Sequence, residues 1–249
     1  MQASFDPQPD WAILIKFGQS EHLEAFRRQG LLYMNPRDYF SRLENDSERS
    51  DRLEGSDRIF QPSAVRALTV HKRDGSTIKI LSSDLAGPLV VGLGESTHCN
   101  VFCMFAVTGP HDGPFVDPRN LAFGDSFLVV LDTQVFLNRV MAAAEKADLG
   151  CEYRMVEYFD AATHSGDTGP FRKPLQFAHQ NEFRIAVRPG SREPLKLIIG
   201  DISDITTPIE SLVRINQTVD FDWEGTRQAG SSVGAPACSE PAAADRQKL

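Results

Sequence analysis

A carboxylate and several hydrogen-bonding side chains meet at one point of the chain, in the segment 177–187, FAHQNEFRIAV. From Glu182 onward, charged and apolar residues alternate, which predicts a half-buried strand. The alternation puts Glu182 and Arg184 on one face of the strand and Phe183 on the opposite, core-facing side. Glu182 should therefore point outward, toward solvent or a cleft, and Gln180 shares its face if the strand begins early enough.

Two interpretations of Glu182 follow from its type and position. A glutamate with a reference pKa of about 4.3 is ionised at pH 7, so it could stabilise a positively charged transition state directly. His179, Gln180 and Asn181 beside it can all hydrogen-bond a ligand. The alternative is a solvated strand residue paired with Arg184. In an exposed position, a Glu182→Gln change should alter stability by no more than about 0.5 kcal/mol.

Three further side chains are candidates for binding an anionic or nucleotide ligand. Lys16 ends an apolar run and offers a compact positive charge for a phosphate, or else it extends from the rim of a sheet into water. Tyr33 should pack its ring in the core and use its hydroxyl for one hydrogen bond. Arg52 lies in the charged segment 49–55, RSDRLEG, where an arginine beside a carboxylate could orient a phosphate. The alternative for that segment is a solvated loop.

The four cysteines, Cys99, Cys103, Cys151 and Cys238, contain no CxxC pair. His98 with Cys99 and Cys103 could form half of a zinc site, but no second pair of ligands has motif spacing. We therefore expect no metal site, with Cys99 and Cys103 on or beside a buried strand as small apolar residues.

Composition and charge limit the class of protein. The 249 residues are 41% hydrophobic and 24% charged, with a net charge of −8. This balance is typical of a globular protein that does not coat nucleic acid or anionic membrane. No apolar run is long enough for a transmembrane helix, and the N-terminus lacks the basic and apolar regions of a secretory signal. We expect a cytoplasmic protein without membrane contact.

The chain divides into three parts by composition. A polar lead occupies residues 1–10, and one folded domain is expected at 11–224. Residues 225–249 are rich in Gly, Ala, Ser and Pro and contain almost no large apolar residue. Such a segment cannot bury enough surface to offset its ordering entropy, so it is predicted to be a disordered tail.

Periodicity and turn residues predict an α+β fold, a mostly antiparallel mixed sheet with a few flanking helices. Ser20 is the expected N-cap of a helix at 21–29 that Gly30 ends. Asp132 or Thr133 should cap the strongest helical segment.

The strand pattern contains one clear hairpin. Asp74-Gly75 is expected to form the turn between strands at 64–72 and 76–81. Further strands are expected at 11–17, 31–34, 89–93, 100–108, 126–131, 153–159 and 195–199, with 100–108 as the central strand because it is the most continuously apolar.

The order of several segments resembles a bacterial and phage-associated domain family of unknown function. These segments are LIKFG, LEAFRRQGLLYMNPRDYF, RSDRLEG, VFCMFAV, FGDSFLVVLDTQVFLNRV, VEYFD and FRKPLQFAHQNEFRIAV, and the resemblance covers about residues 11–200. It implies a binding or sensor module with a partner protein in a defence or toxin system.

A second resemblance implies a chemical reaction. An early strand, a helix that runs into Gly-Leu and a late Q-x-E are similar to the layout of mono-ADP-ribosyltransferases. The resemblance implies NAD as substrate, with Glu182 stabilising the oxocarbenium-like transition state and Gln180 helping to choose the acceptor. Lys16 stands in the region where these enzymes grip NAD, and Tyr33 is the tyrosine candidate. The Ser-Thr-Ser motif of one branch is absent.

The competing enzyme class is a metal-dependent nuclease. Asp160 could be its first acid, but Glu182-Phe183-Arg184 has arginine where a lysine is required, and arginine does not lose its proton. The leading hypothesis is therefore an NAD-consuming ADP-ribosyltransferase-like enzyme, as a toxin or phage-defence effector, whose macromolecular acceptor the sequence does not name. The non-enzymatic alternative is a binding or sensor module. Convergence of Lys16, Tyr33, Arg52 and Glu182 on one cleft would favour the enzyme.

Overall fold

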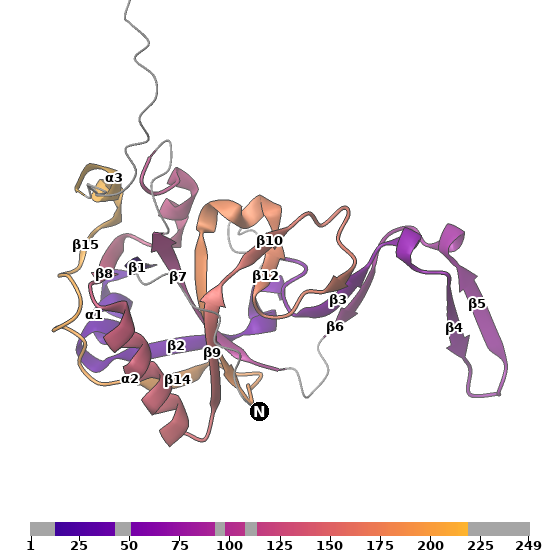
Figure 1. The fold of residues 1–249 in the computed structure, drawn as a ribbon, viewed down its shortest axis with the longest axis horizontal. Helices are drawn as coiled ribbons and strands as arrows, with labels where there is room; N and C mark the ends of the chain where they lie inside the picture. Colours follow the sequence, from indigo (N-terminus) through magenta and orange to yellow (C-terminus); the bar gives the residue numbers. More distant parts are fainter. Residues whose placement is uncertain (1–12, 43–50, 93–97, 108–113, 219–249) are drawn as a thin grey trace, which may run out of the picture.

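The computed structural model describes residues 13–42, 51–92, 98–107 and 114–218. The expected N-terminal lead at 1–10 and the expected tail at 225–249 lie outside these residues. Within them, helices combine with mainly antiparallel strands, so the predicted α+β class is confirmed (Figure 1).

The predicted central strand is confirmed as β7 (Asn100–Val107), which organises the main sheet. One edge of β7 pairs along most of its length with β13 (Glu182–Arg188). The other edge is shared by two strands: β1 (Ile13–Gly18) pairs with residues 105–107, and β2 (Leu31–Pro36) pairs with residues 100–101. Among the described strands, none pairs with residues 102–104 on this edge. We call this gap between β1 and β2 the fork.

The other strands extend the sheet outward from these four. β8 (Ser126–Val130) pairs with β1, β15 (Glu210–Ser211) with β8, β14 (Leu195–Ile198) with β2, and β9 (Gly150–Met155) with β13, all antiparallel. β10 (Glu157–Phe159) and β12 (Arg172–Pro174) form a separate parallel pair. The expected single strand at 153–159 is thus divided between β9 and β10.

Two helices, α1 (Ser20–Gln29) and α2 (Thr133–Lys146), pack against one face of the main sheet (Figure 1). Their contact is aromatic: the Phe26 ring centroid lies 5.4 Å from that of Phe102 and 5.9 Å from that of Phe136. The core on this face is built from Leu14, Leu23, Phe26, Leu32, Met34, Phe102, Met104, Phe136, Val140, Phe183, Ile185 and Val187, with smaller contributions from neighbouring apolar residues.

The helix ends follow the sequence in two of three cases. Asp132 caps α2 by accepting a hydrogen bond from the Val135 amide at 2.9 Å. Gly30 ends α1 with a φ of 61°, a left-handed conformation that glycine adopts easily. The expected Ser20 cap is wrong, because Ser20 already belongs to α1 and its amide donates to Asp125 Oδ1 at 3.1 Å.

Short segments complete the description. The 3-10 helices are η1 (Arg37–Arg42), η2 (Pro62–Ala64), η3 (Ser82–Asp84), η5 (Pro118–Phe123), η6 (Leu175–Gln180) and η7 (Leu212–Arg214), and α3 (Ile215–Thr218) follows η7.

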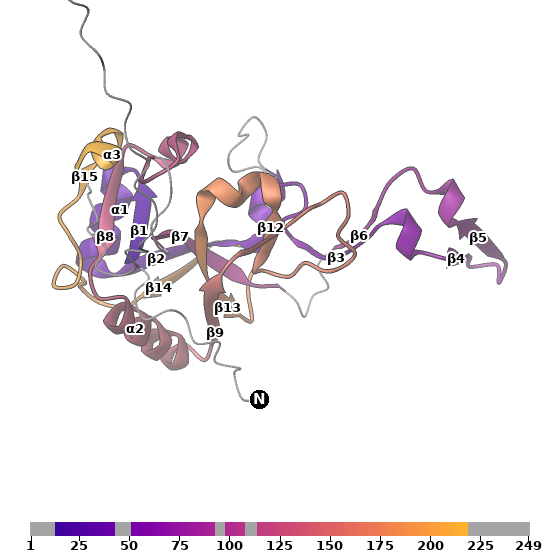
Figure 2. The same cartoon turned by 45° about the horizontal axis from the view of Figure 1, so that its top comes forward.

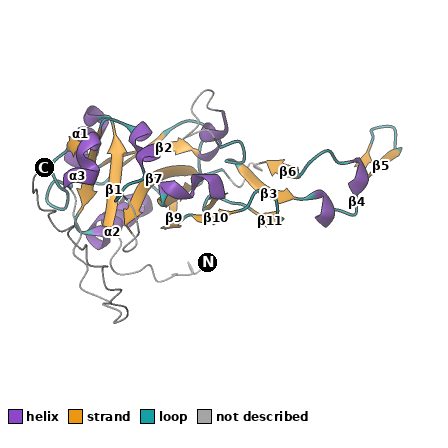
Figure 3. Cartoon of the chain, turned by 90° about the horizontal axis from the view of Figure 1, so that it is seen from above, coloured by secondary structure: helices purple, strands orange, loops and turns teal. Residues whose placement is uncertain are grey.

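A narrow extension projects from the body. At its root, β3 (Ser56–Phe60) pairs with β6 (Leu89–Gly92) and β11 (Gly166–Asp167). At its end, β4 (Ala67–His71) and β5 (Thr77–Leu81) form the predicted hairpin, whose turn is closed by the Lys72 amide and the Ser76 carbonyl at 2.8 Å. Figures 1, 2 and 3 all show this hairpin standing away from the main sheet.

Candidate functional site

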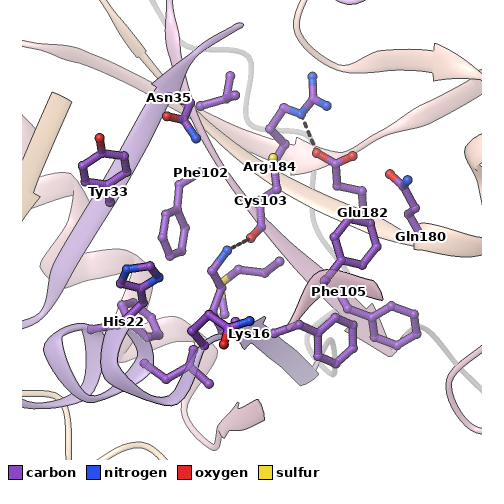
Figure 4. Close-up of a pocket in the computed structure, with 18 of the residues that line it drawn as sticks. Lys16, His22, Tyr33, Asn35, Phe102, Cys103, Phe105, Gln180, Glu182 and Arg184 are labelled. Atoms are coloured by element: carbon purple, nitrogen blue, oxygen red, sulfur yellow. Dashed lines mark hydrogen bonds and ion pairs between the residues drawn. The ribbon is translucent and has the colours of Figure 1, made fainter. Parts of the chain in front are cut away.

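A cavity of about 680 Å³ opens at the fork. Its walls come from β1 and α1 on one side and from β2 and η1 on the other. Its floor is the stretch of β7, residues 102–104, that pairs with β13 but with no described strand on the edge that faces the fork. This volume lies within the range of about 300–1,000 Å³ that is typical of small-molecule sites. The site therefore arises from the divergence of two strands, and Figure 4 shows side chains that line it.

Lys16 crosses the fork. Its Nζ donates to the Cys103 carbonyl oxygen at 2.7 Å and lies 4.4 Å from the centroid of the Phe102 ring. If a strand were paired with this edge of β7, one of its backbone amides would donate a hydrogen bond to the Cys103 carbonyl. The Lys16 ammonium group donates that hydrogen bond instead. The half-buried ammonium group is thus held inside the cavity, as Figure 4 shows.

Aromatic rings form the outer wall. Tyr33 is 48% exposed, so the prediction that its ring packs in the core was wrong. In β2 the side chains of Leu32 and Met34 point to the core, and the alternation of a strand turns Tyr33 to the opposite side, toward the cavity. Tyr39 and Phe40 of η1 line the same wall, with ring centroids 5.3 Å apart in an edge-to-face arrangement.

The inner end of the cavity is charged. Glu182 lines it but is only 4% exposed, so the expectation that this residue faces solvent is wrong. Its Oε1 accepts from Arg184 Nε at 2.7 Å and its Oε2 from Lys173 Nζ at 3.2 Å. The face opposite Phe183 was assigned correctly, but further segments of the chain cover that face.

Glu182 belongs to a larger cluster, the buried ion network, which consists of Arg37, Asp51, Glu54, Lys173, Glu182 and Arg184. Arg184 joins its two halves, because its Nη1 and Nη2 bind the two oxygens of Glu54 at 2.9 and 3.0 Å. Arg37 Nε lies 3.9 Å from Glu54 Oε1, and its Nη2 donates to the Ser56 carbonyl oxygen. Three positive side chains thus balance three carboxylates, as burial of charge requires.

Neighbouring charges decide the direction in which each pKa in and beside the network shifts, because burial alone raises the pKa of every carboxyl and thiol. Burial alone would raise the pKa of Glu182, but Arg184 and Lys173 outweigh it and hold that pKa well below its usual range. Burial and the nearby Glu54 carboxylate raise the pKa of Asp51 to about 6. Burial and Glu182 raise the pKa of the Cys103 thiol to about 12. At pH 7, therefore, Glu182 is ionised and Cys103 is a neutral thiol.

Gln180 reaches the site by a different route from the one expected. It ends η6, and Asn181, with a φ of 36°, separates it from β13. Because β13 begins only at Glu182, the condition under which Gln180 would share the strand face of Glu182 is not met. Its Oε1 nevertheless accepts from Lys173 Nζ at 2.7 Å, and the residue lines the cavity.

Arg52 does not join this group. It lies in an exposed turn and is not among the residues that line the cavity. Two other members of its segment, Asp51 and Glu54, belong to the buried ion network, and Glu54 binds Arg184 directly. The structure thus brings together Lys16, Tyr33, Gln180 and Glu182 and leaves Arg52 outside.

Four residues of the site region were missed by reasoning from sequence. His22 and Asn35 line the cavity from α1 and β2, and Lys173 and Glu54 complete the charge balance around Glu182 and Arg184. No sequence signal identified Lys173 and Glu54 as partners, because only the tertiary structure shows that the strand face of Glu182 and Arg184 is covered.

The remaining sequence candidates lie elsewhere. Cys99 is buried next to β7 and Cys103 lies within β7, as predicted. In the described residues there is no group of three or more His, Cys, Asp or Glu that could hold a metal ion. Asp160 lies in an exposed turn, where its carboxylate accepts from the Ala162 amide at 2.9 Å.

Comparison of the chain with protein-family models, with curated proteins and with solved structures returned no match. None of the helices in the described ranges is long and apolar enough to cross a membrane.

Proposed function

We propose that the cavity at the fork binds NAD and that the protein is an ADP-ribosyltransferase-like enzyme that releases nicotinamide. The observation that carries the proposal is the convergence of Lys16, Tyr33 and Glu182, three of the four residues named for this test, on one cavity that Gln180 also lines and Arg52 does not. An ionised carboxylate lies at its inner end, and a lysine and exposed aromatic rings lie nearer its opening.

Each of these groups suits one part of a dinucleotide. Tyr33 and Tyr39 offer ring surfaces on which a planar base can stack. Lys16 offers a point charge for a phosphate. Glu182 offers a negative charge for the ribose as nicotinamide leaves.

The proposed reaction breaks the bond between the ribose carbon and the nicotinamide nitrogen. The electron pair of that bond leaves with nicotinamide, positive charge develops on the ribose, and a nucleophile of the acceptor then bonds to the same carbon. Glu182 acts only electrostatically in this scheme, so it needs to stay ionised. Arg184 and Lys173 keep its pKa low enough for that.

The contacts of Glu182 with Arg184 and Lys173 also favour a second function, which is binding without catalysis. Both oxygens of Glu182 already accept hydrogen bonds from cations, and these positive charges weaken the field that the carboxylate directs at a ligand. A binding or sensor module, as a partner in a defence or toxin system, would hold a nucleotide in this cavity without breaking it.

Nicotinamide release separates the two functions. We expect the wild type to release nicotinamide from NAD in the presence of a lysate as acceptor source, and Glu182→Gln to do so about 100- to 1,000-fold more slowly at matched folded fraction. Glu157→Gln, which alters an exposed carboxylate, is the matched control and should retain the wild-type rate.

Calorimetry with NAD completes the test. Lys16→Met should weaken binding by about 1.5–3 kcal/mol, the range for a hydrogen bond to a charged group. NAD that binds the wild type but is never consumed would favour the sensor module. NAD that does not bind at all would overturn the proposed enzyme.

A further inference from the structure

The main sheet ends at β9, and none of the described strands pairs with the outer edge of β9. The backbone groups that face this edge follow from the inner pairing, in which the Val156 amide donates to the Glu182 carbonyl oxygen at 2.9 Å. Alternate residues of an antiparallel strand direct their amides and carbonyls to the same neighbour, so Glu152 and Arg154 also bond β13. The amides and carbonyls that face outward therefore belong to Cys151, Tyr153 and Met155.

This edge has few of the features that normally protect an edge strand. Proline, bulges and a short strand length prevent a second strand from pairing. β14 and β15, which end the sheet elsewhere, are only four and two residues long. β9 has six residues without proline, GCEYRM, and it pairs with β13 in an unbroken register. A regular row of hydrogen-bonding groups is thus presented at the edge.

The side chains of β9 have contacts on both faces of the sheet. On one face Tyr153 packs against the main core. On the other face Glu152 Oε1 lies 3.1 Å from Arg188 Nη1, and the guanidinium carbon of Arg154 lies 4.4 Å from the centroid of the Phe171 ring. Glu152 and Arg154 are nevertheless both exposed. The strand is therefore held in place while its two opposite charges stay accessible.

The sequence of β9 is complementary to itself in one register. When two β9 strands run antiparallel with Tyr153 facing Tyr153, Cys151 of each copy faces Met155 of the other. These residues have the outward backbone groups, so each such pair exchanges two hydrogen bonds. In the same register Glu152 of each copy faces Arg154 of the other. A shift by two residues would place Glu152 against Glu152 or Arg154 against Arg154, and like charges directly opposite each other are destabilising.

A hollow beside this edge accommodates side chains of a second strand. It has a volume of about 620 Å³ and lies between the C-terminal half of α2 and the start of β9, where Met141, Leu149 and Cys151 supply apolar lining. Met155 of the second copy faces Cys151 in the register above, so its flexible side chain lies at this hollow.

We propose that two copies of the chain form a two-fold dimer in which their β9 strands pair antiparallel about Tyr153 and join the two main sheets into one. Backbone hydrogen bonds at Cys151, Tyr153 and Met155 hold the strands together. The pairs of Glu152 with Arg154 fix the register. This dimer does not depend on the proposed function of the cavity.

Exchange of the two charges tests the register. Sedimentation of the full-length wild type should show a dimer with a dissociation constant on the order of 10 µM, as expected for a small interface. Glu152→Arg and Arg154→Glu, each alone, should raise this constant by at least about tenfold, because each places like charges opposite each other on both sides of the two-fold axis. An equimolar mixture of the two variants should associate like the wild type, since every glutamate then faces an arginine.

Arg58→Glu is the matched control. It reverses the charge of an arginine on β3 whose side chain is 59% exposed, away from β9. This variant should dimerise like the wild type.

Amide hydrogen exchange locates the contact without any substitution. When the wild type is concentrated from about 1 µM to about 500 µM, the amides of Cys151, Tyr153 and Met155 should exchange about fivefold more slowly, because only the dimer gives them hydrogen-bond partners. The amides of Glu152 and Arg154 should be protected equally at both concentrations, because they bond β13 within one chain.

Each of the following results would overturn the proposal. The first is a wild type that stays monomeric at about 500 µM. The second is a mixture of Glu152→Arg and Arg154→Glu that associates no better than either variant alone. The third is exchange of the three outward amides that does not depend on concentration, which would show that the edge is covered within one chain or that the copies meet elsewhere.

Discussion

Replacing Glu182 by glutamine tests the central claim about the site, which is that this carboxylate is a buried partner of two cations. The change removes a negative charge that is 4% exposed, with Arg184 Nε at 2.7 Å and Lys173 Nζ at 3.2 Å. The oxygen of glutamine can accept from one of these donors, but its NH₂ group then faces the other.

The expected loss follows from these contacts. Removing one partner of a buried ion pair costs about 3–5 kcal/mol, and the one hydrogen bond that survives returns about 1 kcal/mol. We therefore expect the free energy of unfolding at pH 7 to fall by about 2–4 kcal/mol. This corrects the change of at most about 0.5 kcal/mol that an exposed strand position would give.

Urea unfolding followed by circular dichroism measures the change. The control is Glu157→Gln, because Glu157 Oε2 lies 3.0 Å from Arg172 Nε while the two side chains are 64% and 38% exposed. Exposed pairs contribute about 0–1 kcal/mol, so this variant should remain close to the wild type.

A double variant tests the mechanism of the loss. If Glu182→Gln is destabilising because it leaves an uncompensated ammonium group, then adding Lys173→Met should recover part of the lost stability. A loss below about 1 kcal/mol for Glu182→Gln, equal to that of the control, would refute the reasoning and show that Glu182 is hydrated.

Two further predictions concern pH and backbone geometry. The pKa of Asp51 is raised to about 6 in the folded protein, so its contribution to stability is complete below the unfolded pKa near 4 and is lost as pH rises through 6. Asp51→Asn should therefore gain up to about 3 kcal/mol relative to the wild type between pH 4 and pH 7.5; a difference that is flat with pH in urea unfolding would contradict the shift. Gly30→Ala should destabilise by more than about 2 kcal/mol, because φ is +61° and a Cβ would lie 2.1 Å from the Gly200 carbonyl oxygen. Gly75→Ala, where φ is +83° and no atom lies within 4 Å of the added Cβ, isolates the strain without the clash and should cost only about 1–2 kcal/mol; equal melting temperatures for the two variants would argue against the contact with Gly200.

Local patterns predicted local structure well. Asp74-Gly75 predicted the hairpin turn, the apolar run predicted β7, and Gly30 predicted the end of α1. These features depend on backbone preferences and on interactions among residues close in the sequence. The Ser20 cap failed for a tertiary reason, since Asp125, 105 residues away, accepts the Ser20 amide.

Some of the residues that line the cavity were also predicted from the sequence. The types of Lys16, Gln180 and Glu182 indicated ligand chemistry, and the alternation of β13 correctly separated Glu182 and Arg184 from the core face of Phe183. Arg52 was chosen from the right charged segment, but Asp51 and Glu54 are the residues of that segment that are buried.

The sequence alone determined which side chains share a face, because strand alternation is a property of the backbone. Only the tertiary structure decided what lies against that face. Glu54 meets Arg184 across 130 positions of sequence, and the cavity exists because β1 and β2 pair with different halves of β7. Neither the Glu54–Arg184 contact nor the gap between β1 and β2 produces a periodic pattern in the sequence, because each depends on how segments distant in the sequence pack together. Glu182, which the sequence predicts to be an exposed strand residue, therefore lies between the buried cations Arg184 and Lys173.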